Sequence, residues 1–383
     1  MRMLVAGGGT GGHVFPGVAL AEEVVTRHPA NDAIFVGTAR GLEAKIVPQA
    51  GFPIELIEVK GLKGKGLLGA LLNLLLLPRA FLQSWRILKR WRPDVVVGVG
   101  GYASGPVVLA AWLMRIPTAV QEQNAIAGFT NRVLGRFVKA AFTAFPEAAA
   151  SFPRRKVYQL GNPIRRVLME NFMRPRVDHD RPRLLVFGGS QGAHALNMRV
   201  VEALPHLADL REALRITHQT GARDREQVEK GYRACGFEPD VREFISDMST
   251  AYAESDLVVC RAGATTLAEL TVCKKPSILV PFPAAADNHQ VVNARSLVDA
   301  GAAVMIEERE LTGETLAAEI RAILGSPERR EQMARAAGRL GSPQAAKEIA
   351  DVCIELVRRR WGSPFGQARE PGQKPDRPPG LAS

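Results

Sequence analysis

RMLVAGGGTGGH, residues 2–13, carries a short apolar run directly into a glycine-rich turn. An apolar strand followed by Gly-x-Gly-x-x-Gly and a helix is the typical start of a nucleotide-binding βα unit. Residues 183–197, RLLVFGGSQGAHALN, repeat this arrangement in the second half of the chain. Two such units predict an α/β protein with two nucleotide-binding domains, each built on a parallel sheet.

The rest of the chain alternates short β-type runs with helical patterns. DVVVGVG (94–100) and DLVVC (256–260) are continuous apolar runs, typical of strands buried on both faces of a parallel sheet. With 383 residues the chain is longer than one hydrophobic core usually supports. Residues 173–182, MRPRVDHDRP, are polar and contain two prolines, which predicts part of an interdomain linker.

The composition excludes several classes of protein. Hydrophobic residues make up 46% of the chain, too many for a wholly disordered protein. The 4 cysteines form no C-x-x-C pair, which argues against a disulfide framework and a zinc site. Glycines interrupt the apolar stretch that begins at Met3, so no export signal is expected. The longest apolar run, residues 67–77, is too short to cross a bilayer.

The net charge of +11 is concentrated between Lys60 and Pro93, a segment with eight Lys or Arg residues and no Asp or Glu. Leucines and Trp85 recur there at steps of three and four, the spacing of one helix face. Pro78 suits the first turn of a helix, so we expect a second helix to begin there.

A basic helix with a Leu- and Trp-rich face suits an anionic membrane surface. The alternative is an ordinary helix that packs on the sheet and exposes a solvated basic face. The segment lacks the motifs of nucleic-acid-binding modules, so nucleic acid is not an expected partner. The residues expected to associate with the membrane are Leu74, Arg79, Phe81, Trp85, Arg86, Lys89 and Arg90.

The first glycine loop is suited to bind phosphate. Backbone N–H groups at the start of a helix attract anions, and Thr10 and His13 add side-chain donors. The next strand ends in Val36-Gly37-Thr38, without the acidic residue that binds the ribose of an adenosine, so NAD is disfavoured. His13 is either a structural residue at the start of the helix or a group near the reacting centre.

Two later loops also precede helices. Ser190 lies in the second glycine loop, and Gly263–Thr266 follow an apolar strand directly, where a diphosphate could bind. Glu269 lies one turn further on, where its carboxylate would accept the hydroxyls of a ribose or complete a capping box with Thr266. Arg165 would reach a phosphate from the first half of the chain, or it is a solvated surface charge.

Six motifs in a fixed order resemble the MurG family, the bacterial N-acetylglucosaminyltransferases that convert lipid I to lipid II. The resemblance covers about residues 1–360. The motifs are GGGTGGHVFPG (7–17), VGVGGYASGP (97–106), QEQNAIAGFTNR (121–132), GNPIR (161–165), GGSQGAHALN (188–197) and CRAGATTLAEL (260–270).

The resemblance implies the GT-B architecture, two Rossmann-like domains facing across a cleft, with no metal ion and no cofactor. It also implies a peripheral protein at the cytoplasmic face of the bacterial inner membrane. We expect a first domain over 1–163, a second over 164–342, a helix over 343–361 that returns to the first domain and a disordered tail over 362–383. The family's residues for UDP-N-acetylglucosamine correspond to Thr10, Gly11, Gly12, Asn124, Arg165, Ser190, Ile245, Ala264, Thr265, Thr266, Leu267, Ala268, Glu269 and Gln290.

The reaction that the resemblance implies is transfer of N-acetylglucosamine from UDP-N-acetylglucosamine to the muramoyl 4-hydroxyl of lipid I, the undecaprenyl-diphosphate-linked muramoylpentapeptide. The product serves peptidoglycan synthesis, and through it cell shape and cell division. Converting an α-linked donor to a β-linked product by one displacement needs a base, and His13 is the candidate. Two alternatives remain, an enzyme like the UDP-N-acetylglucosamine 2-epimerases and a non-catalytic, membrane-bound sensor of nucleotide sugars.

Overall fold

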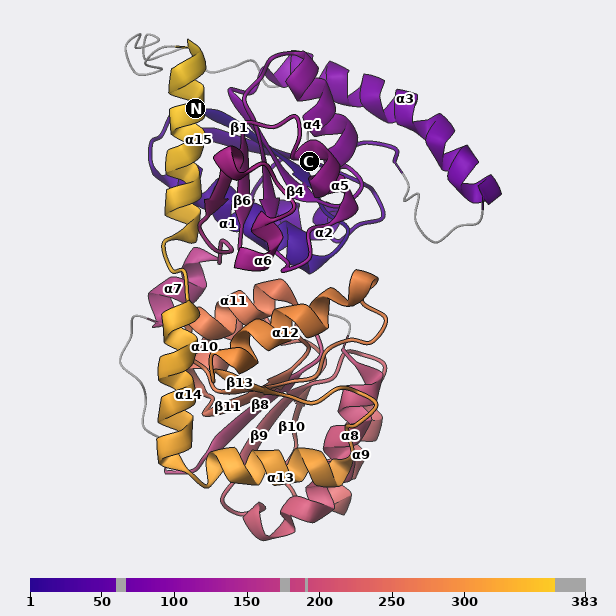
Figure 1. The fold of residues 1–383 in the computed structure, drawn as a ribbon. Coiled ribbons are helices and arrows are strands. Elements are labelled where there is room, and N and C mark those ends of the chain that lie inside the picture. The colour runs from indigo at the N-terminus through magenta and orange to yellow at the C-terminus, as the bar shows by residue number, and fades with distance from the viewer. Residues whose placement is uncertain (60–66, 173–179, 190–191, 362–383) are drawn as a thin grey trace.

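The computed structural model describes residues 1–59, 67–172, 180–189 and 192–361. Two α/β units, each built on a parallel sheet, lie one above the other (Figure 1). The predicted α/β class with two parallel sheets is therefore confirmed. Ser190, residues 173–179 of the predicted linker and the predicted tail lie outside the described residues.

The first sheet has the strand order β3-β2-β1-β4-β5-β6-β7, and each neighbouring pair is parallel. Its central strand β4 is buried at every residue, because VVVGVG places no polar side chain on either face. The strands are β1 (Arg2–Gly7), β2 (Asp32–Gly37), β3 (Ile54–Leu56), β4 (Val95–Gly100), β5 (Thr118–Glu122), β6 (Ala140–Thr143) and β7 (Val157–Gln159).

The second sheet has the order β10-β9-β8-β11-β12-β13 and is also parallel throughout. The two strands that precede the glycine loops, β1 and β8, each have a neighbouring strand on both sides. Each glycine loop therefore begins away from the ends of its sheet. The strands are β8 (Arg183–Phe187), β9 (Arg215–Gln219), β10 (Asp240–Arg242), β11 (Leu257–Cys260), β12 (Ser277–Leu279) and β13 (Ala303–Met305).

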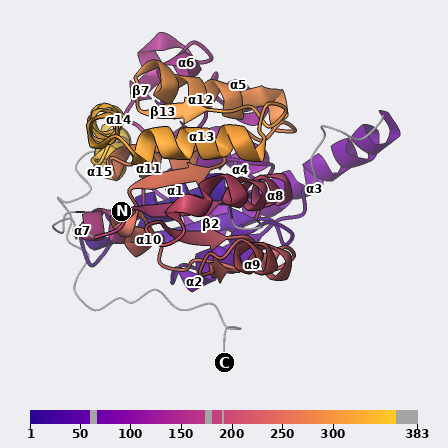
Figure 2. The ribbon, with the colours of Figure 1, turned by 90° about the horizontal axis from the view of Figure 1, so that it is seen from below.

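Helices connect the strands and cover both faces of each sheet (Figures 1 and 2). In the first unit they are α1 (Gly11–Thr26), α2 (Glu43–Gln49), α3 (Leu67–Trp91), α4 (Ser104–Leu113), α5 (Phe129–Leu134) and α6 (Pro146–Ala149). Those that follow are α7 (Arg166–Phe172), α8 (His194–Ala203), α9 (Arg225–Ala234), α10 (Met248–Glu254), α11 (Ala264–Val272), α12 (His289–Asp299), α13 (Gly313–Leu324), α14 (Pro327–Leu340) and α15 (Ala345–Trp361). Short 3-10 helices occupy Arg154–Lys156, Leu204–Leu210 and Ala286–Asn288.

The last helix, α15, runs back along the first unit (Figure 1). Ile349, Ala350 and Cys353 are buried in the same apolar cluster as residues of β1 and α1. Arg27, directly after α1, donates a hydrogen bond to Asp351 of α15 at 2.5 Å, which connects the two helices at their surface. Helix α15 therefore contributes to the core of the first unit.

Helix α3 runs without interruption through Pro78, contrary to the expectation of a new helix there. Proline removes one backbone N–H and its hydrogen bond, but the turns on either side keep their own. Both views show α3 extending beyond the rest of the molecule (Figures 1 and 2). Among the described residues, no helix combines the length and apolar content needed to span a bilayer.

Candidate functional site

The loops singled out in the sequence all follow the carboxyl ends of strands. The first glycine loop follows β1, Asn124 follows β5, Ile245 follows β10 and Gly263 follows β11. In an open parallel α/β sheet this edge is the usual place for a ligand. The edges of the two sheets face each other, with α11 and α12 nearest the first unit (Figure 1).

Side-chain hydrogen bonds join the two units at this junction. Thr265 Oγ1 of α11 donates to the backbone carbonyl of Gly12 at 3.1 Å. Asn293 of α12 is fully buried and accepts from the Ala125 N–H at 2.8 Å, while its Nδ2 lies 3.3 Å from Asn124 Oδ1. Four residues predicted from distant parts of the sequence are thus within one small region, namely Gly12, Asn124, Thr265 and the adjoining Thr266.

His13 lies in the first turn of α1, with its Nδ1 3.3 Å from Thr10 Oγ1. Burial lowers the pKa of His13, and the Glu122 carboxylate and the Gly8 backbone oppose this shift. The imidazole is therefore neutral at pH 7, the state that can accept a proton. His289 of α12 also lowers the pKa of His13. This residue of the second unit therefore lies near the imidazole of His13.

Glu122 is a residue that the sequence analysis did not single out. It ends β5, is only 2% exposed and accepts hydrogen bonds from the N–H groups of Asn124 and Gly128 and from Asn131 Nδ2. These donors fix the position of the carboxylate near His13. The available signal was its position in the motif QEQNAIAGFTNR, residues 121–132.

Glu43 was also missed, and it shapes the first glycine loop. Its buried carboxylate accepts from the Gly9 N–H at 2.6 Å and from the N–H of Thr38 at 2.8 Å. A Cβ at Gly8, which has φ of +146°, would lie 2.2 Å from the carboxyl carbon of Glu43. Glycine is therefore required at this position for the loop to rest on the carboxylate.

Glu269 is buried within α11 and does not cap that helix. Helix α11 begins at Ala264 with Gly263 as its N-cap, so the capping box of Thr266 and Glu269 is wrong. Tyr252 donates its hydroxyl to Glu269 Oε2 at 3.0 Å, and Arg165 lies 3.8 Å from Oε1. Burial raises the pKa of Glu269, and these two partners oppose the rise.

Arg165 bridges the two units. Its guanidinium lies 4.7 Å from the centroid of the Phe15 ring of α1 while facing Glu269 of α11. Its Nε is buried and makes no hydrogen bond to any described residue. This arrangement, a guanidinium held at the junction with its side chain 25% exposed, suits an anionic ligand and excludes the interpretation of Arg165 as a solvated surface charge.

The other predicted residues take different positions. Gln290 Oε1 accepts from the Phe282 N–H at 2.9 Å and so holds the loop after β12. Leu267 is buried in an apolar cluster of the second unit. Ile245 is buried too, and its N–H donates to Gln219 Oε1 at 2.8 Å. Gly11, Ala264 and Ala268 lie on α1 and α11.

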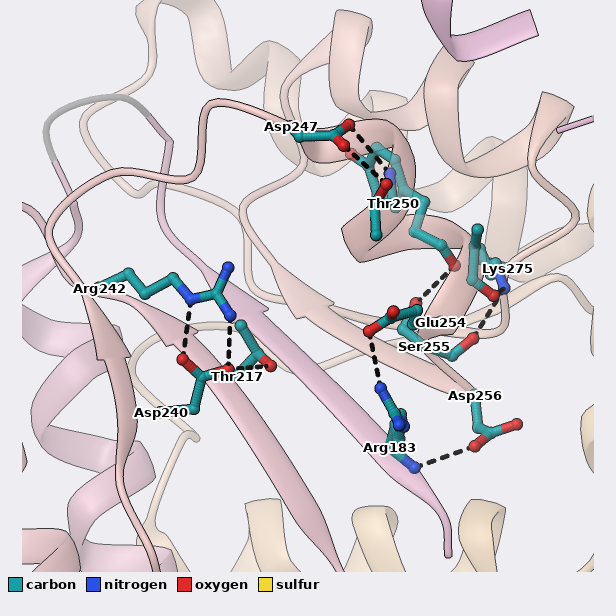
Figure 3. Close-up of polar contacts among 12 residues, drawn as sticks. Arg183, Thr217, Asp240, Arg242, Asp247, Thr250, Glu254, Ser255, Asp256 and Lys275 are labelled. Atoms are coloured by element: carbon teal, nitrogen blue, oxygen red, sulfur yellow. Dashed lines mark hydrogen bonds and ion pairs between the residues drawn. The ribbon is translucent and has the colours of Figure 1, made fainter. Parts of the chain in front are cut away.

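A cavity of about 280 Å³ lies beside the loop that contains Ile245. It is lined by this loop, by α10 and by residues of β8, β9 and β10. Its two arginines are paired with carboxylates, Arg183 with Glu254 and Arg242 with Asp240, as Figure 3 shows. Thr217 also donates to Asp240 at 2.8 Å. The walls of this cavity are therefore already neutralised.

No group of three or more His, Cys, Asp or Glu side chains that could hold a metal ion occurs within the described ranges. The positive groups at the junction are instead Arg165 and the N-terminus of α11.

Comparisons with known proteins agree with this geometry. The N-terminal domain model of glycosyltransferase family 28 matches residues 3–143, and the C-terminal domain model matches residues 183–350. A curated relative from Anaeromyxobacter sp. (strain K) is 88% identical over the full length of both chains. Another from Myxococcus xanthus is 62% identical and covers 97% of each chain. Both are named UDP-N-acetylglucosamine--N-acetylmuramyl-(pentapeptide) pyrophosphoryl-undecaprenol N-acetylglucosamine transferase.

Solved structures give the same result. The structure of MurG from Acinetobacter baumannii is 33% identical, covers 92% of this chain and 99% of its own, and superposes with a TM-score of 0.74. A UDP-GlcNAc 2-epimerase from Neisseria meningitidis has a TM-score of 0.66 at 13% identity, over 93% of this chain and 100% of its own, which shows a shared fold alone. The chain belongs to glycosyltransferase family 28 and, within it, to the MurG family that its motifs resemble.

Proposed function

We propose that this chain transfers N-acetylglucosamine from UDP-N-acetylglucosamine to the muramoyl 4-hydroxyl of lipid I, which yields lipid II for peptidoglycan synthesis. The observation that carries the proposal is the hydrogen bond from Thr265 to the Gly12 carbonyl. It places the loop with a candidate base, His13, directly against the start of α11, a candidate site for a diphosphate. The candidate base and the candidate diphosphate site therefore lie at one junction.

The donor would be held mainly by the second unit. The N–H groups at the start of α11 and the Arg165 guanidinium would meet the diphosphate, and Glu269 would accept the ribose hydroxyls. The Tyr252 hydroxyl holds one carboxylate oxygen of Glu269 in place. Ser190, Ile245, Gln290 and the remaining predicted donor residues complete this proposed site.

The reaction is a single displacement. The acceptor oxygen forms a bond to the anomeric carbon of the sugar as the bond from that carbon to the diphosphate oxygen breaks. Neutral His13 takes the proton of the attacking hydroxyl, and the Glu122 carboxylate, which raises the pKa of His13, stabilises the resulting imidazolium. Arg165 and the N-terminus of α11 stabilise the charge on the departing UDP.

Assaying the products of labelled UDP-N-acetylglucosamine with a lipid-linked muramoyl acceptor tests this function. A β-linked disaccharide on the acceptor and free UDP are expected. Release of an epimerised sugar without acceptor would support the epimerase-like alternative. Binding without any turnover would support the sensor.

We propose domain borders that follow the sequence expectation, 1–163 and 164–342, with 343–361 returning to the first domain. Support comes from the strands, since β1 to β7 end at Gln159 and β8 begins at Arg183. The burial of Ile349 and Cys353 against the first sheet supports the assignment of the last helix.

We further propose that the first domain binds an anionic membrane as a peripheral protein on the cytoplasmic face. Arg86 and Lys89 of α3 are exposed, whereas Phe81 and Trp85 are half-buried against the domain's core. Helix α4, which packs on α3, ends in the exposed side chains of Trp112 and Leu113, which the sequence analysis did not single out. Leu74 lies in the part of α3 whose side chains are not described.

Neutralising the basic face of α3 should release the protein from anionic vesicles. Each cation near such a surface contributes roughly 1 kcal/mol, so removing four should outweigh a marginal apolar contact. Gln is preferable to Glu here, because Arg79 and Arg90 pair with Glu58 and Glu55, and a reversed charge would repel them. The test variant replaces Arg79, Arg86, Lys89 and Arg90 with Gln.

Co-sedimentation with anionic vesicles across a salt series measures this release. The matched control makes the same change in net charge on the second unit, with Gln at Arg211, Arg223, Lys230 and Arg233. The control should bind as the unmodified protein does, and both variants should still react with a soluble short-chain acceptor. Equal vesicle binding by the two variants would contradict a membrane role for α3.

A further inference from the structure

Gln219 lies between the two loops that the proposed function assigns to the donor on the second unit. It is the last residue of β9, paired across the sheet with Phe187 at the end of β8 and with Arg242 at the end of β10. The second glycine loop follows Phe187, and the loop with Ile245 follows Arg242. The register of the sheet therefore places this side chain between the two loops.

The amide of Gln219 makes one hydrogen bond to each loop. Its Nε2 donates to the Gly189 carbonyl at 2.9 Å, and its Oε1 accepts from the Ile245 N–H at 2.8 Å. The side chain is only 3% exposed. Only one orientation of a primary amide satisfies both partners, because a flip would place N–H against N–H and oxygen against oxygen.

The residues around Gln219 strengthen this connection. The N–H groups of Thr220 and Gly221 donate to the carbonyls of Arg242 and Glu243 at 3.0 and 3.1 Å. On the other side, a Cβ at Gly192, which has φ of +74°, would lie 1.9 Å from the Thr220 carbonyl oxygen. The end of β9 therefore contacts both loops through its backbone, and Gln219 adds a side-chain link.

Packing alone does not hold the loop with Ile245. Its neighbour Phe244 is 57% exposed, and both Phe244 and Ile245 line the cavity of about 280 Å³. A loop that borders such a cavity has fewer packing contacts and depends more on its hydrogen bonds for its position. The hydrogen bonds from Gln219, Thr220 and Gly221 connect this loop to the end of β9, on the side of the glycine loop.

We propose that Gln219 is a positioning residue for the nucleotide, setting the separation of Gly189, at the start of the second glycine loop, and the loop at 243–247. The proposal rests on the proposed function, because that function makes both loops donor-binding. Gln219 acts through Gly189 and Ile245 and not through contact with the reacting atoms. Its loss changes the affinity for the UDP portion while the chemical step keeps its base and its leaving-group contacts.

Two substitutions of similar size separate the contributions. Gln219→Leu removes both hydrogen bonds, whereas Gln219→Glu keeps an acceptor for Ile245 and turns an oxygen toward the Gly189 carbonyl. We expect both to raise the KM for UDP-N-acetylglucosamine and the Kd for UDP by roughly 10- to 100-fold. The kcat should stay within about 3-fold, and the KM for the acceptor should not change.

A pH series gives a readout that a purely structural role would not produce. A buried carboxylate facing a carbonyl has a raised pKa, and its protonated form regains a donor. The ratio of the KM of Gln219→Glu to that of the unmodified protein should therefore decrease as the pH is lowered from about 8 to about 6. The same ratio for Gln219→Leu should stay constant.

Asn31→Leu is the matched control. Asn31 is a buried amide of the first unit that donates to the Val24 carbonyl and accepts from the N-terminal amine, both at 2.7 Å, far from either loop. We expect it to lower the Tm and leave the KM unchanged. If the Gln219 variants lower the Tm without changing the KM or the Kd for UDP, the proposal is overturned.

Calorimetric titration with UDP alone keeps this test separate from the test of function. Failure of the unmodified protein to transfer sugar would contradict the proposed function, and the loop role of Gln219 would still be read from the Kd for UDP. A transferase that is active in the unmodified form but whose Gln219 variants bind UDP normally would contradict only the positioning role.

Discussion

Replacing His13 with alanine should lower turnover by about 10²–10⁴-fold while the affinity for UDP-N-acetylglucosamine is largely kept, as removal of a general base usually does. His13 is neutral because burial lowers its pKa, and the buried Glu122 stabilises the cation that forms when it accepts a proton. Single-turnover assays with saturating donor measure the chemical step directly.

The pH profile of the unmodified protein supplies a second measurement. A general base works in its unprotonated form, and a lowered pKa keeps His13 in that form to a lower pH. The acid limb of kcat should therefore lie below about 6.5, the ordinary value of imidazole. Glu122→Gln removes a carboxylate that raises the pKa of His13, so it should shift this limb further toward acid.

His206→Ala is a suitable control for His13→Ala, because His206 is an exposed histidine of the second unit. It should leave the rate and the pH profile unchanged. Normal turnover with weakened donor affinity in His13→Ala would instead assign His13 to phosphate binding in the first glycine loop.

Glu269→Ala should weaken UDP binding by about 1–3 kcal/mol, the range for hydrogen bonds to a charged group. The carboxylate is 7% exposed, is oriented by Tyr252 and faces Arg165, so its loss leaves buried partners unsatisfied as well. Isothermal titration with UDP measures the change. Glu331→Ala, on the exposed surface of α14, is the control.

The pH dependence of UDP binding should carry the signature of Glu269. Because burial raises its pKa, the ribose contact is present above that raised value and is lost as the pH falls through it. Folding responds with the opposite sign, since the buried carboxylate costs the folded state stability only where it is ionised. Unchanged UDP affinity in Glu269→Ala, with a lowered Tm, would show a purely structural role.

Much of the fold could be read from local sequence. Apolar runs such as residues 94–100 have no polar face, so they had to be strands covered on both sides, and parallel order follows from the helices between them. The glycine loops at 7–12 and 188–192 showed where the strands end. Helix α3 differs from expectation because a helix can continue past Pro78 with one hydrogen bond missing.

Some residues of the candidate site could be predicted from the sequence, and others became apparent only in the structure. His13, Glu269 and Arg165 lie in motifs that stand out in sequence because loops after strands carry chemistry. Glu122, Glu43 and Gln219 did not stand out, since each is a single polar residue whose partners come from other strands and loops.

The sequence by itself determined the two parallel sheets, the loops at their carboxyl ends and the basic segment that became α3, because each depends on neighbours within a few turns of the chain. Only the tertiary structure decided which loops meet. The bond from Thr265 to Gly12 joins residues 253 positions apart, and the contact of Asn293 with Ala125 joins residues 168 positions apart. Burial at that junction sets the charge states of His13 and Glu269, and burial depends on every element packed around them.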